Sequence, residues 1–255
     1  MKDSSMEREE LGDLYLDLLR NCLTGLVYDD PPLEWSGVGL RPFDRRKRED
    51  GLDWPARAHS MIGAKRMLQL QRAAEIVIDG GVPGDFIETG VWRGGACILM
   101  RAVLKVHGVT DRRVWVADSF RGLPPPRPDR YPVDRGDHLH TIRALAVSVE
   151  AVRANFARYG LLDDQVAFLE GWFRDTLPSA PIDRLAILRL DGDMYESTMD
   201  ALSALYDKVS QGGFVIVDDY GAYPRCRAAI EDFRATRGIT AAMHDIDGSG
   251  VYWQP

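Results

Sequence analysis

Residues 86–97 read Phe-Ile-Glu-Thr-Gly-Val-Trp-Arg-Gly-Gly-Ala-Cys, and this stretch decides the fold. A short apolar run ends in Glu88 and Gly90, and a pair of glycines then opens a helix-like segment. This order predicts a strand, a tight turn and a helix N-terminus. Glycine lets a ligand approach the main chain closely, and the first N–H groups of a helix carry partial positive charge. We therefore expect a small ligand to bind at this turn.

The spacing of this turn differs from that of a dinucleotide-binding turn. It is Glu88-x-Gly90-x-x-x-Gly94-Gly95 rather than G-x-G-x-x-G, and the acid precedes the first glycine. A carboxylate at this place can accept hydrogen bonds from an ammonium group, which a pyrophosphate would not supply. The turn resembles the first motif of class I S-adenosylmethionine-dependent methyltransferases. The resemblance implies that Glu88 and Gly90 lie near the methionine part of that cofactor.

The composition narrows the class of protein. The chain has 255 residues, of which 45% are hydrophobic and 28% charged, as expected for one α/β domain with additions. The net charge is -7, so no basic stripe is available for a polyanion and we expect no nucleic-acid partner. We also expect no membrane span and a cytoplasmic location, because no apolar stretch approaches about 18 residues. The three cysteines are far apart and are expected to be free thiols.

The first 80 residues predict two helices separated by a long loop. An amphipathic helix is expected from Leu11, with its buried face either on the core, in a subunit contact or in a substrate pocket. The apolar residues that follow its period are Leu14, Tyr15, Leu18, Leu19, Cys22 and Leu26. Residues 31–55 show no period and carry Trp35, Phe43 and Trp54, which favours a mobile lid. A second helix is expected over residues 55–79, before Gly80 and Gly81.

From residue 86 onward, short apolar runs alternate with segments of helical period, which predicts βαβ units and a parallel sheet. Strands are expected near residue 86 and at 114–117, 166–169, 185–190 and 214–217. Helices are expected at 94–106, 147–159, 197–209 and 224–237. Two β-like runs, 241–246 and 250–253, flank Asp247-Gly248-Ser249 and predict an antiparallel hairpin. The predicted fold is a doubly wound, Rossmann-like α/β sheet that an antiparallel C-terminal hairpin completes, as in class I methyltransferases.

Polar residues at the ends of the second and third expected strands are candidates for binding a nucleoside. Asp118 ends the second strand, where an acid typically binds ribose hydroxyls, and Ser119 follows it. Gly171, Trp172 and Phe173 follow the third strand. The two aromatic side chains either wall an adenine or belong to the core.

Acidic pairs follow the next two strands, as Asp191-Gly192-Asp193 and Asp218-Asp219. Carboxylates this close repel one another unless a cation lies among them, and a hard ion with oxygen ligands, Mg²⁺, suits such a site. We predict that Asp191, Asp218 and Asp219 are the metal ligands. Asp193 is predicted to take a proton from a substrate hydroxyl.

Two histidines are reserve candidates for the same proton transfer. His138 and His140 lie in the proline-rich, apparently irregular segment 119–140, which is expected to overhang the site. Either could act as a general base, because the pKa of histidine lies near neutral pH.

With these residues identified, the chain closely resembles the macrocin O-methyltransferase family of antibiotic biosynthesis, which includes mycinamicin and novobiocin sugar methyltransferases. The likeness covers residues 14–19, 58–63, 88–97, 114–120, 155–164, 171–173, 190–195, 218–220 and 250–253. It implies Mg²⁺-dependent transfer of a methyl group from S-adenosylmethionine to a deoxysugar hydroxyl of a glycosylated natural product. It also implies a helical extension over residues 1–80 with a lid-like loop at 31–55, a cofactor-binding domain over 81–255, and a homodimer or higher oligomer.

The resemblance assigns roles to single positions. It implies that Asp191, Asp218 and Asp219 hold the metal and that Asp193 is the base. The residues that it places along the cofactor are Met61, Glu88, Asp118, Ser119 and Trp172.

The chain departs from the macrolide-acting members of the family at residues 31–55 and 121–150, where an acceptor would be recognised. The acceptor therefore stays open, and a metal-dependent methyltransferase of phenols or catechols is the nearest alternative. A glycosyltransferase that uses Asp191 and Asp193 as a D-x-D motif would leave Glu88 and the Asp218-Asp219 pair without a role. A non-catalytic cofactor-binding module would not need four clustered carboxylates.

Overall fold

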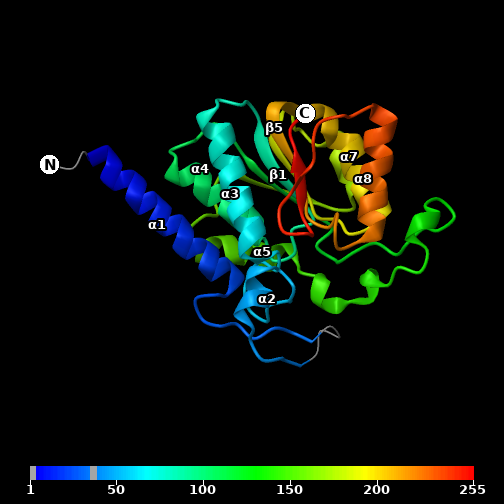
Figure 1. Cartoon of the computed structure of the whole chain (residues 1–255), viewed down its shortest axis with the longest axis horizontal. Coiled ribbons are helices and arrows are strands. Elements are labelled where there is room, and N and C mark those ends of the chain that lie inside the picture. The colour runs from blue at the N-terminus through cyan, green and yellow to red at the C-terminus, as the bar shows by residue number, and fades with distance from the viewer. Residues whose placement is uncertain (1–3, 35–38) are drawn as a thin grey trace.

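The structure is a computed structural model that describes residues 4–34 and 39–255, with side chains described from Glu10 onward. Trp35, part of the expected lid, lies outside the described residues. A seven-stranded sheet in the order β3-β2-β1-β4-β5-β7-β6 forms the centre (Figure 1). Its strands are β1 (Asp85–Thr89), β2 (Val114–Asp118), β3 (Val166–Glu170), β4 (Leu185–Leu190), β5 (Val209–Val217), β6 (His244–Asp245) and β7 (Val251–Trp253). The first five pair in parallel and the last two are antiparallel, which confirms the predicted doubly wound sheet and its hairpin.

Helices cover both faces of the sheet because successive strand residues point to opposite sides. Phe86 belongs to one buried cluster, with residues of α1, α3, α4 and α5, whereas Ile87 belongs to the other, with residues of α7 and α8. The helices are α1 (Ser4–Thr24), α2 (Arg45–Glu49), α3 (Gly63–Asp79), α4 (Gly95–Val106), α5 (Val149–Arg158), α6 (Phe173–Thr176), α7 (Tyr195–Leu205) and α8 (Pro224–Arg237). Short 3₁₀ turns lie at Pro132–Asp134, Leu139–Thr141, Arg143–Leu145, Leu177–Ser179 and Tyr206–Lys208. The N-terminal helices therefore share a core with the sheet.

Two expected helix boundaries were wrong. The helix expected from Pro55 begins at Gly63, because Pro55 forms a β-bridge with Pro32. The chain is closely packed at this start, where a Cβ on Gly63 would lie 2.3 Å from the backbone N of Gly51. The helix expected over 197–209 is α7, which ends at Leu205 and is followed by a 3₁₀ turn. Val209 already belongs to β5, so that strand is longer than the expected 214–217.

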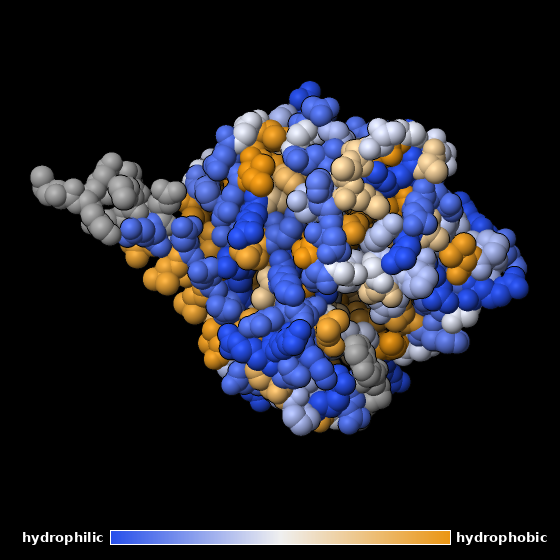
Figure 2. Space-filling view, viewed as in Figure 1, coloured by the Kyte–Doolittle hydropathy of each residue, from blue (hydrophilic) through white to orange (hydrophobic). Residues whose placement is uncertain are grey.

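The apolar residues that the sequence places on one face of α1 lie on two sides of it in the structure. Leu16, Leu19 and Leu23 are buried against the core, whereas Leu14 and Leu18 are 65% and 55% exposed. Apolar residues therefore occupy two sides of this helix, and only one side packs against α3 and α4. The helix extends away from the rest of the fold, and Figure 2 shows apolar residues along its outer side (Figures 1 and 2).

Residues 39–55 are not the featureless loop that the lack of a period predicts. They contain α2, whose Arg48 is fully buried and forms an ion pair with Asp53. Arg48 also donates 2.8 Å hydrogen bonds to the carbonyls of Thr24 and Asp30, which ties this segment to the end of α1. A buried guanidinium group is tolerated because its donors are satisfied. The movement of this segment as a lid stays a prediction.

Two expectations from composition concern the whole chain. The three cysteines are free, as expected. Within residues 4–34 and 39–255, no helix combines the length and the apolar character needed to cross a membrane.

Candidate active site

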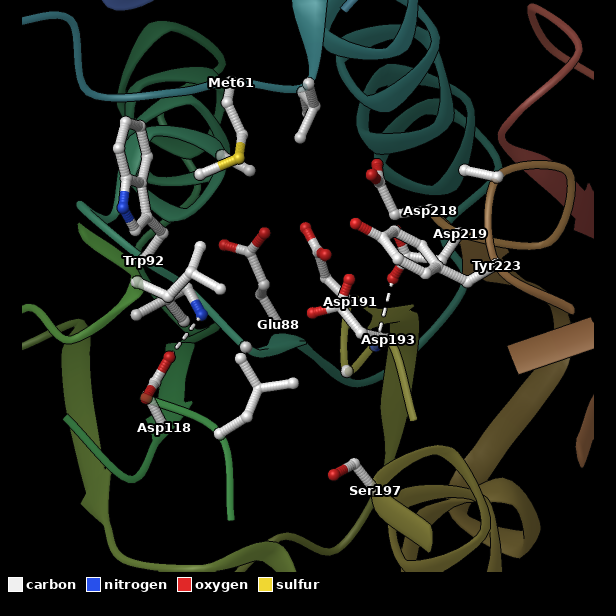
Figure 3. Close-up of a pocket in the computed structure, with 18 of the residues that line it drawn as sticks. Met61, Glu88, Trp92, Asp118, Asp191, Asp193, Ser197, Asp218, Asp219 and Tyr223 are labelled. Carbon is white, nitrogen blue, oxygen red and sulfur yellow. Dashed lines mark hydrogen bonds between the residues drawn. The ribbon is translucent and has the colours of Figure 1, made fainter. Parts of the chain in front are cut away.

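The carboxyl ends of the parallel strands border a cavity of about 640 Å³. This volume lies in the usual range for sites that bind small molecules or cofactors. All the residues predicted to bind the cofactor line it, namely Met61, Glu88, Gly90, Asp118, Ser119, Gly171, Trp172 and Phe173. Asp191, Asp193, Asp218 and Asp219 line it as well, and Figure 3 shows their carboxylates together beside Glu88.

The glycine-rich turn explains how β1 leads into α4. Gly90 has a φ of 92°, and a Cβ there would lie 1.7 Å from the backbone oxygen of Asp191. Gly94 has a φ of 86° and is the N-cap residue that precedes α4. Only glycine adopts these conformations without strain, and only glycine leaves room for the neighbouring strand end. The N–H of Gly95 donates to the carbonyl of His59 at 2.9 Å, so this amide of the helix start is not available to a ligand.

Glu88 is buried and both of its oxygens have partners. Arg189 donates to one oxygen, and the thiol of Cys97 donates to the other at 3.0 Å. Burial raises the pKa of Glu88, and the guanidinium of Arg189 opposes that shift. The carboxylate is thus held at the edge of the cavity, where it can accept a hydrogen bond from a ligand's ammonium group.

Asp118 stabilises the turns on both sides of it. Its carboxylate accepts 2.8 Å hydrogen bonds from the backbone N–H groups of Val91 and Phe120 (Figure 3 shows the first). Burial raises the pKa of Asp118, and these amides oppose that shift by favouring the charged form. Its predicted contact with ribose hydroxyls stays a prediction, but the residue faces the cavity that such a ligand would enter.

Asp191, Asp218 and Asp219 meet at the ends of β4 and β5. One carboxylate oxygen from each lies within 4.8 Å of the others. Burial and the charges of neighbouring carboxylates raise the pKa values of Asp191 and Asp219. A set made only of carboxylate oxygens suits Mg²⁺, and a cation among them would relieve their repulsion. The residues present therefore fit the predicted metal.

Two buried arginines enter this cluster, and the sequence reasoning missed both. Arg189 donates to Asp191 at 2.8 Å and also pairs with Asp218. Arg66, from α3, pairs with the other oxygen of Asp218 and donates to Asp247 at 2.9 Å. The signal that could have revealed Arg189 is its position inside the otherwise apolar strand Leu-Ala-Ile-Leu-Arg-Leu, because arginine is almost never fully buried without a partner.

Asp193 lies just past the end of β4, as its place in the sequence predicts. It has a φ of 57°, and its backbone N–H donates to Asp219 at 3.2 Å. Burial, together with the charges of Asp218 and Asp137, raises the pKa of Asp193 to about 7. A carboxylate with a pKa near the working pH is suited to general-base catalysis.

The histidines of the site are not those that the sequence favoured. His138 and His140 are not among the residues that line the cavity, so the structure does not bring them to the carboxylates. His59 does line it, and its Nδ1 is 2.8 Å from the hydroxyl of Tyr159. Burial and two nearby arginines lower the pKa of His59 to about 4, so this ring is neutral at physiological pH.

The proline-rich segment after β2 is anchored beside the cavity. Asp134 is fully buried and accepts 2.9 Å hydrogen bonds from the N–H groups of Tyr195 and Glu196, at the start of α7. Arg127 forms an ion pair with Glu196. An acceptor for the first amides of a helix stabilises its start. This segment therefore orders the helix that follows Asp193.

Comparisons with known proteins identify the family to which this sequence is similar. The family model described as macrocin-O-methyltransferase (TylF) matches residues 12–255. The chain is 56% identical to 8-demethyl-8-(2,3-dimethoxy-alpha-L-rhamnosyl)-tetracenomycin-C 4'-O-methyltransferase of Streptomyces olivaceus, over 96% of this chain and 94% of the relative. It is 53% identical to demethyldecarbamoylnovobiocin O-methyltransferase of Streptomyces niveus, over 99% and 97% of the two chains.

A third relative and a solved structure extend these comparisons. Mycinamicin III 3''-O-methyltransferase of Micromonospora griseorubida is 49% identical, over 95% of this chain and 96% of the relative. The solved structure of the O-methyltransferase NovP superimposes with a TM-score of 0.91 and 54% identity, over 95% of this chain and 98% of that chain. The range matched by the family model includes all the residues that line the cavity.

Proposed function

Because the chain belongs to the macrocin O-methyltransferase family, and is thus an S-adenosylmethionine-dependent O-methyltransferase of natural-product biosynthesis, we propose that it methylates a deoxysugar hydroxyl of a glycosylated antibiotic precursor with the aid of Mg²⁺. One observation carries the proposal. A cluster of carboxylates with the geometry of a cation site shares a cavity with the Glu88–Gly90 turn.

The cofactor and the metal supply chemistry that side chains lack. S-adenosylmethionine supplies an electrophilic methyl carbon, and Mg²⁺ supplies positive charge that lowers the pKa of an acceptor hydroxyl. Asp191, Asp218 and Asp219 would hold the metal. The cofactor would be held by Glu88 at its ammonium group, by Asp118 at its ribose and by Trp172 and Phe173 along its adenine.

Asp193 would remove the proton of the acceptor hydroxyl. Its backbone N–H donates a hydrogen bond to the carboxylate of Asp219, which holds the base beside a proposed metal ligand. Asp193 would thereby supply a nucleophilic oxygen for the methyl carbon, and the cofactor's sulfur would leave as a neutral thioether. Orienting the two reactants and stabilising the developing alkoxide would provide much of the acceleration.

The sugar acceptor is supported by the names of the relatives. The tetracenomycin relative acts on a rhamnosyl compound, and the novobiocin and mycinamicin relatives act on other natural products. Leu52 and Trp54, from residues 31–55, and Leu123 and Pro124, from residues 121–150, provide apolar surface along the cavity. These are the two regions in which the sequence departs from macrolide-acting members.

Family membership rules out two of the alternative functions that the sequence left open. A glycosyltransferase and a non-catalytic binding module are both excluded by the match to O-methyltransferases, which covers residues 12–255 in the family model and 96% of the chain in the tetracenomycin relative. Methyl transfer to a phenol or catechol uses the same cofactor and metal chemistry, so the assay must distinguish this alternative from transfer to a sugar.

The experiment combines binding with acceptor profiling. S-adenosylmethionine is titrated into the purified protein by calorimetry, and methyl transfer is then measured on rhamnose-like glycosides and on simple catechols, with Mg²⁺ and with chelator. We expect cofactor binding, and transfer to a glycoside that chelator abolishes and added Mg²⁺ restores. Transfer to catechols alone would contradict the sugar acceptor, and full activity in chelator would contradict the metal.

A matched pair of variants links the result to the cavity. Glu88→Gln removes the acceptor of the proposed ammonium contact, so cofactor affinity should fall. Asp175→Asn changes an exposed carboxylate on α6 that does not line the cavity, so cofactor affinity should be unchanged. Equal affinities in both variants would contradict the place of Glu88 in the cofactor site.

We also propose that α1 joins two copies of the chain. Its outer side exposes Leu11, Leu14, Tyr15 and Leu18, which together form an apolar strip along the helix (Figure 2). Contiguous apolar strips on a protein surface commonly mark interaction sites. A two-fold dimer requires one self-complementary surface, and this strip provides a single continuous one. We further propose a cytoplasmic location, which suits an enzyme with three free cysteines.

A further inference from the structure

Arg189 occupies an unusual position for a cation. It is the fifth of six residues in β4, every one of which is buried, and its side chain is 1% exposed. Central strands of parallel sheets are normally apolar, because helices cover both faces. A guanidinium group here must therefore be matched to specific acceptors.

The acceptors come from both halves of the proposed site. Nη1 of Arg189 donates to Oε1 of Glu88 and, at 2.8 Å, to Oδ2 of Asp191. Nη2 donates to Oδ1 of Asp218. Glu88 is the proposed partner of the cofactor's ammonium group, whereas Asp191 and Asp218 are proposed metal ligands. One planar group thus contacts the cofactor site and the metal site.

The register of the sheet places Arg189 between them. Glu88 in β1 lies directly beside Arg189 in the parallel pairing with β4. Asp218 follows Val217, the residue of β5 that pairs with Leu190. Neighbouring side chains on one face of a sheet are close enough to contact each other, so the fold itself brings these groups together.

We propose that Arg189 is a positioning residue that fixes Glu88, Asp191 and Asp218 in one arrangement, so that the cofactor site and the metal site are formed by the same guanidinium group. This inference rests on the proposed function, because it takes those three carboxylates as ligands of the cofactor and the metal. The fork of Arg189 sets the angle between carboxylates at the ends of three different strands. Partners that orient metal ligands typically change metal affinity by about 10- to 100-fold when they are mutated.

A simpler role for Arg189 makes the opposite prediction. If the residue only balanced negative charge, its replacement by a neutral side chain would leave the cluster more negative and would strengthen the binding of a cation. If Arg189 orients the carboxylates, the same replacement weakens cation binding, because the ligands lose their arrangement. The sign of the change in affinity separates the two roles.

Two variants and two probes test this. Arg189→Met removes the charge and the donors, whereas Arg189→Lys keeps the charge but replaces the planar fork with a single nitrogen. The affinity for S-adenosylmethionine is measured by calorimetry, and the affinity for Mn²⁺ alone by electron paramagnetic resonance. Thermal unfolding is followed in parallel, so that affinities are compared on folded protein. If the methionine variant does not fold, the lysine variant decides the question.

Arg101→Lys is the matched control. Arg101 is also a buried arginine, and it forms two hydrogen bonds with Asp163, at 2.9 and 2.7 Å. Neither residue lines the cavity. The same substitution there should lower the unfolding temperature and leave both affinities unchanged.

We expect Arg189→Lys and Arg189→Met to weaken the binding of Mn²⁺ by about tenfold or more, and to weaken S-adenosylmethionine binding as well. Tighter Mn²⁺ binding by Arg189→Met would overturn the inference in favour of simple charge balance. Unchanged affinities with a lower unfolding temperature, as in the control, would overturn it in favour of a purely structural role. If the wild-type protein binds no Mn²⁺, the metal part of the proposed function fails, and the S-adenosylmethionine titrations still decide the role of Arg189 at Glu88.

Discussion

Replacement of Asp193 by asparagine tests the proposed base with little disturbance of the fold. The two side chains have the same shape, and asparagine tolerates a φ of 57° as well as aspartate does. The hydrogen bond from residue 193 to Asp219 uses the backbone N–H, so the substitution keeps it. We therefore expect Asp193→Asn to fold normally and to bind S-adenosylmethionine within about threefold of the wild-type affinity, which corresponds to a change below about 0.7 kcal/mol.

The expected loss lies in the chemical step. A positioned general base typically contributes about 10²- to 10⁴-fold to the rate, which corresponds to about 3–5 kcal/mol in the activation barrier. Asp193 has a pKa of about 7, near the value at which a base is most effective at neutral pH. An amide cannot accept the proton as a carboxylate does, so kcat should fall by at least about 100-fold.

The assay measures kcat and KM for methyl transfer to the best glycoside acceptor, with saturating Mg²⁺. Asp175→Asn serves as the control, because it removes an equal charge from an exposed position on α6 outside the cavity lining. We expect kcat to fall in Asp193→Asn and to stay unchanged in Asp175→Asn. Turnover of Asp193→Asn within about fivefold of wild type, less than any typical general-base contribution, would refute the assignment.

Three further predictions use other parts of the structure. Because Asp193 must be ionised to accept a proton, kcat/KM should reach its maximum above the pKa of Asp193 and fall tenfold per pH unit below it. The midpoint should lie at or below about 7, since bound Mg²⁺ favours the ionised form. A pH–rate profile in which kcat/KM does not fall at low pH would contradict this. Arg48→Met should lower the free energy of unfolding by about 3–5 kcal/mol in denaturant titrations, because it leaves the buried carboxylate of Asp53 unpaired. Arg45→Met, on the exposed side of α2, should lower it by less than about 1 kcal/mol. Leu14→Glu combined with Leu18→Glu should give a monomer by light scattering without loss of folding stability, since both side chains are exposed, and an unchanged oligomer would contradict the proposed interface.

Local patterns in the sequence were sufficient for the fold. The period of apolar residues changes between strand and helix along residues 86–253, and each change marks an element that the structure contains. The expected boundaries of α8 and β4 were correct to the residue, and those of α4 to within one residue. Hydrophobic periodicity works here because an α/β sheet buries its strands between helices that each need one apolar face.

The sequence was also sufficient to bring together the acidic residues of the site. Asp191 and Asp218 each follow a parallel strand, and the carboxyl ends of such strands lie at one edge of the sheet. Their approach therefore follows from chain order and strand direction alone. The same argument explains why Glu88 and Asp118 line the same cavity.

The tertiary structure alone decided what surrounds these carboxylates. Arg189 contacts Glu88 across 101 residues of sequence, and Arg66 contacts Asp218 across 152. No local period records such contacts, because they depend on strand register and on how α3 packs against the sheet. Whether a buried carboxylate meets a cation or another carboxylate is settled only when distant segments pack together.

The packing of the N-terminal segments was likewise not predictable from local sequence patterns. The period of α1 predicted one buried face, and only its packing against α3 and α4 selects Leu16 and Leu19 as buried residues. The residues around Arg48 have the composition of a solvated loop. Its side chain nevertheless donates hydrogen bonds to the carbonyls of Thr24, at the end of α1, and of Asp30, and it pairs with Asp53 in its own segment. Sequence determines which groups are able to be buried or paired, whereas the tertiary fold decides which are, because burial depends on the surface that another segment presents.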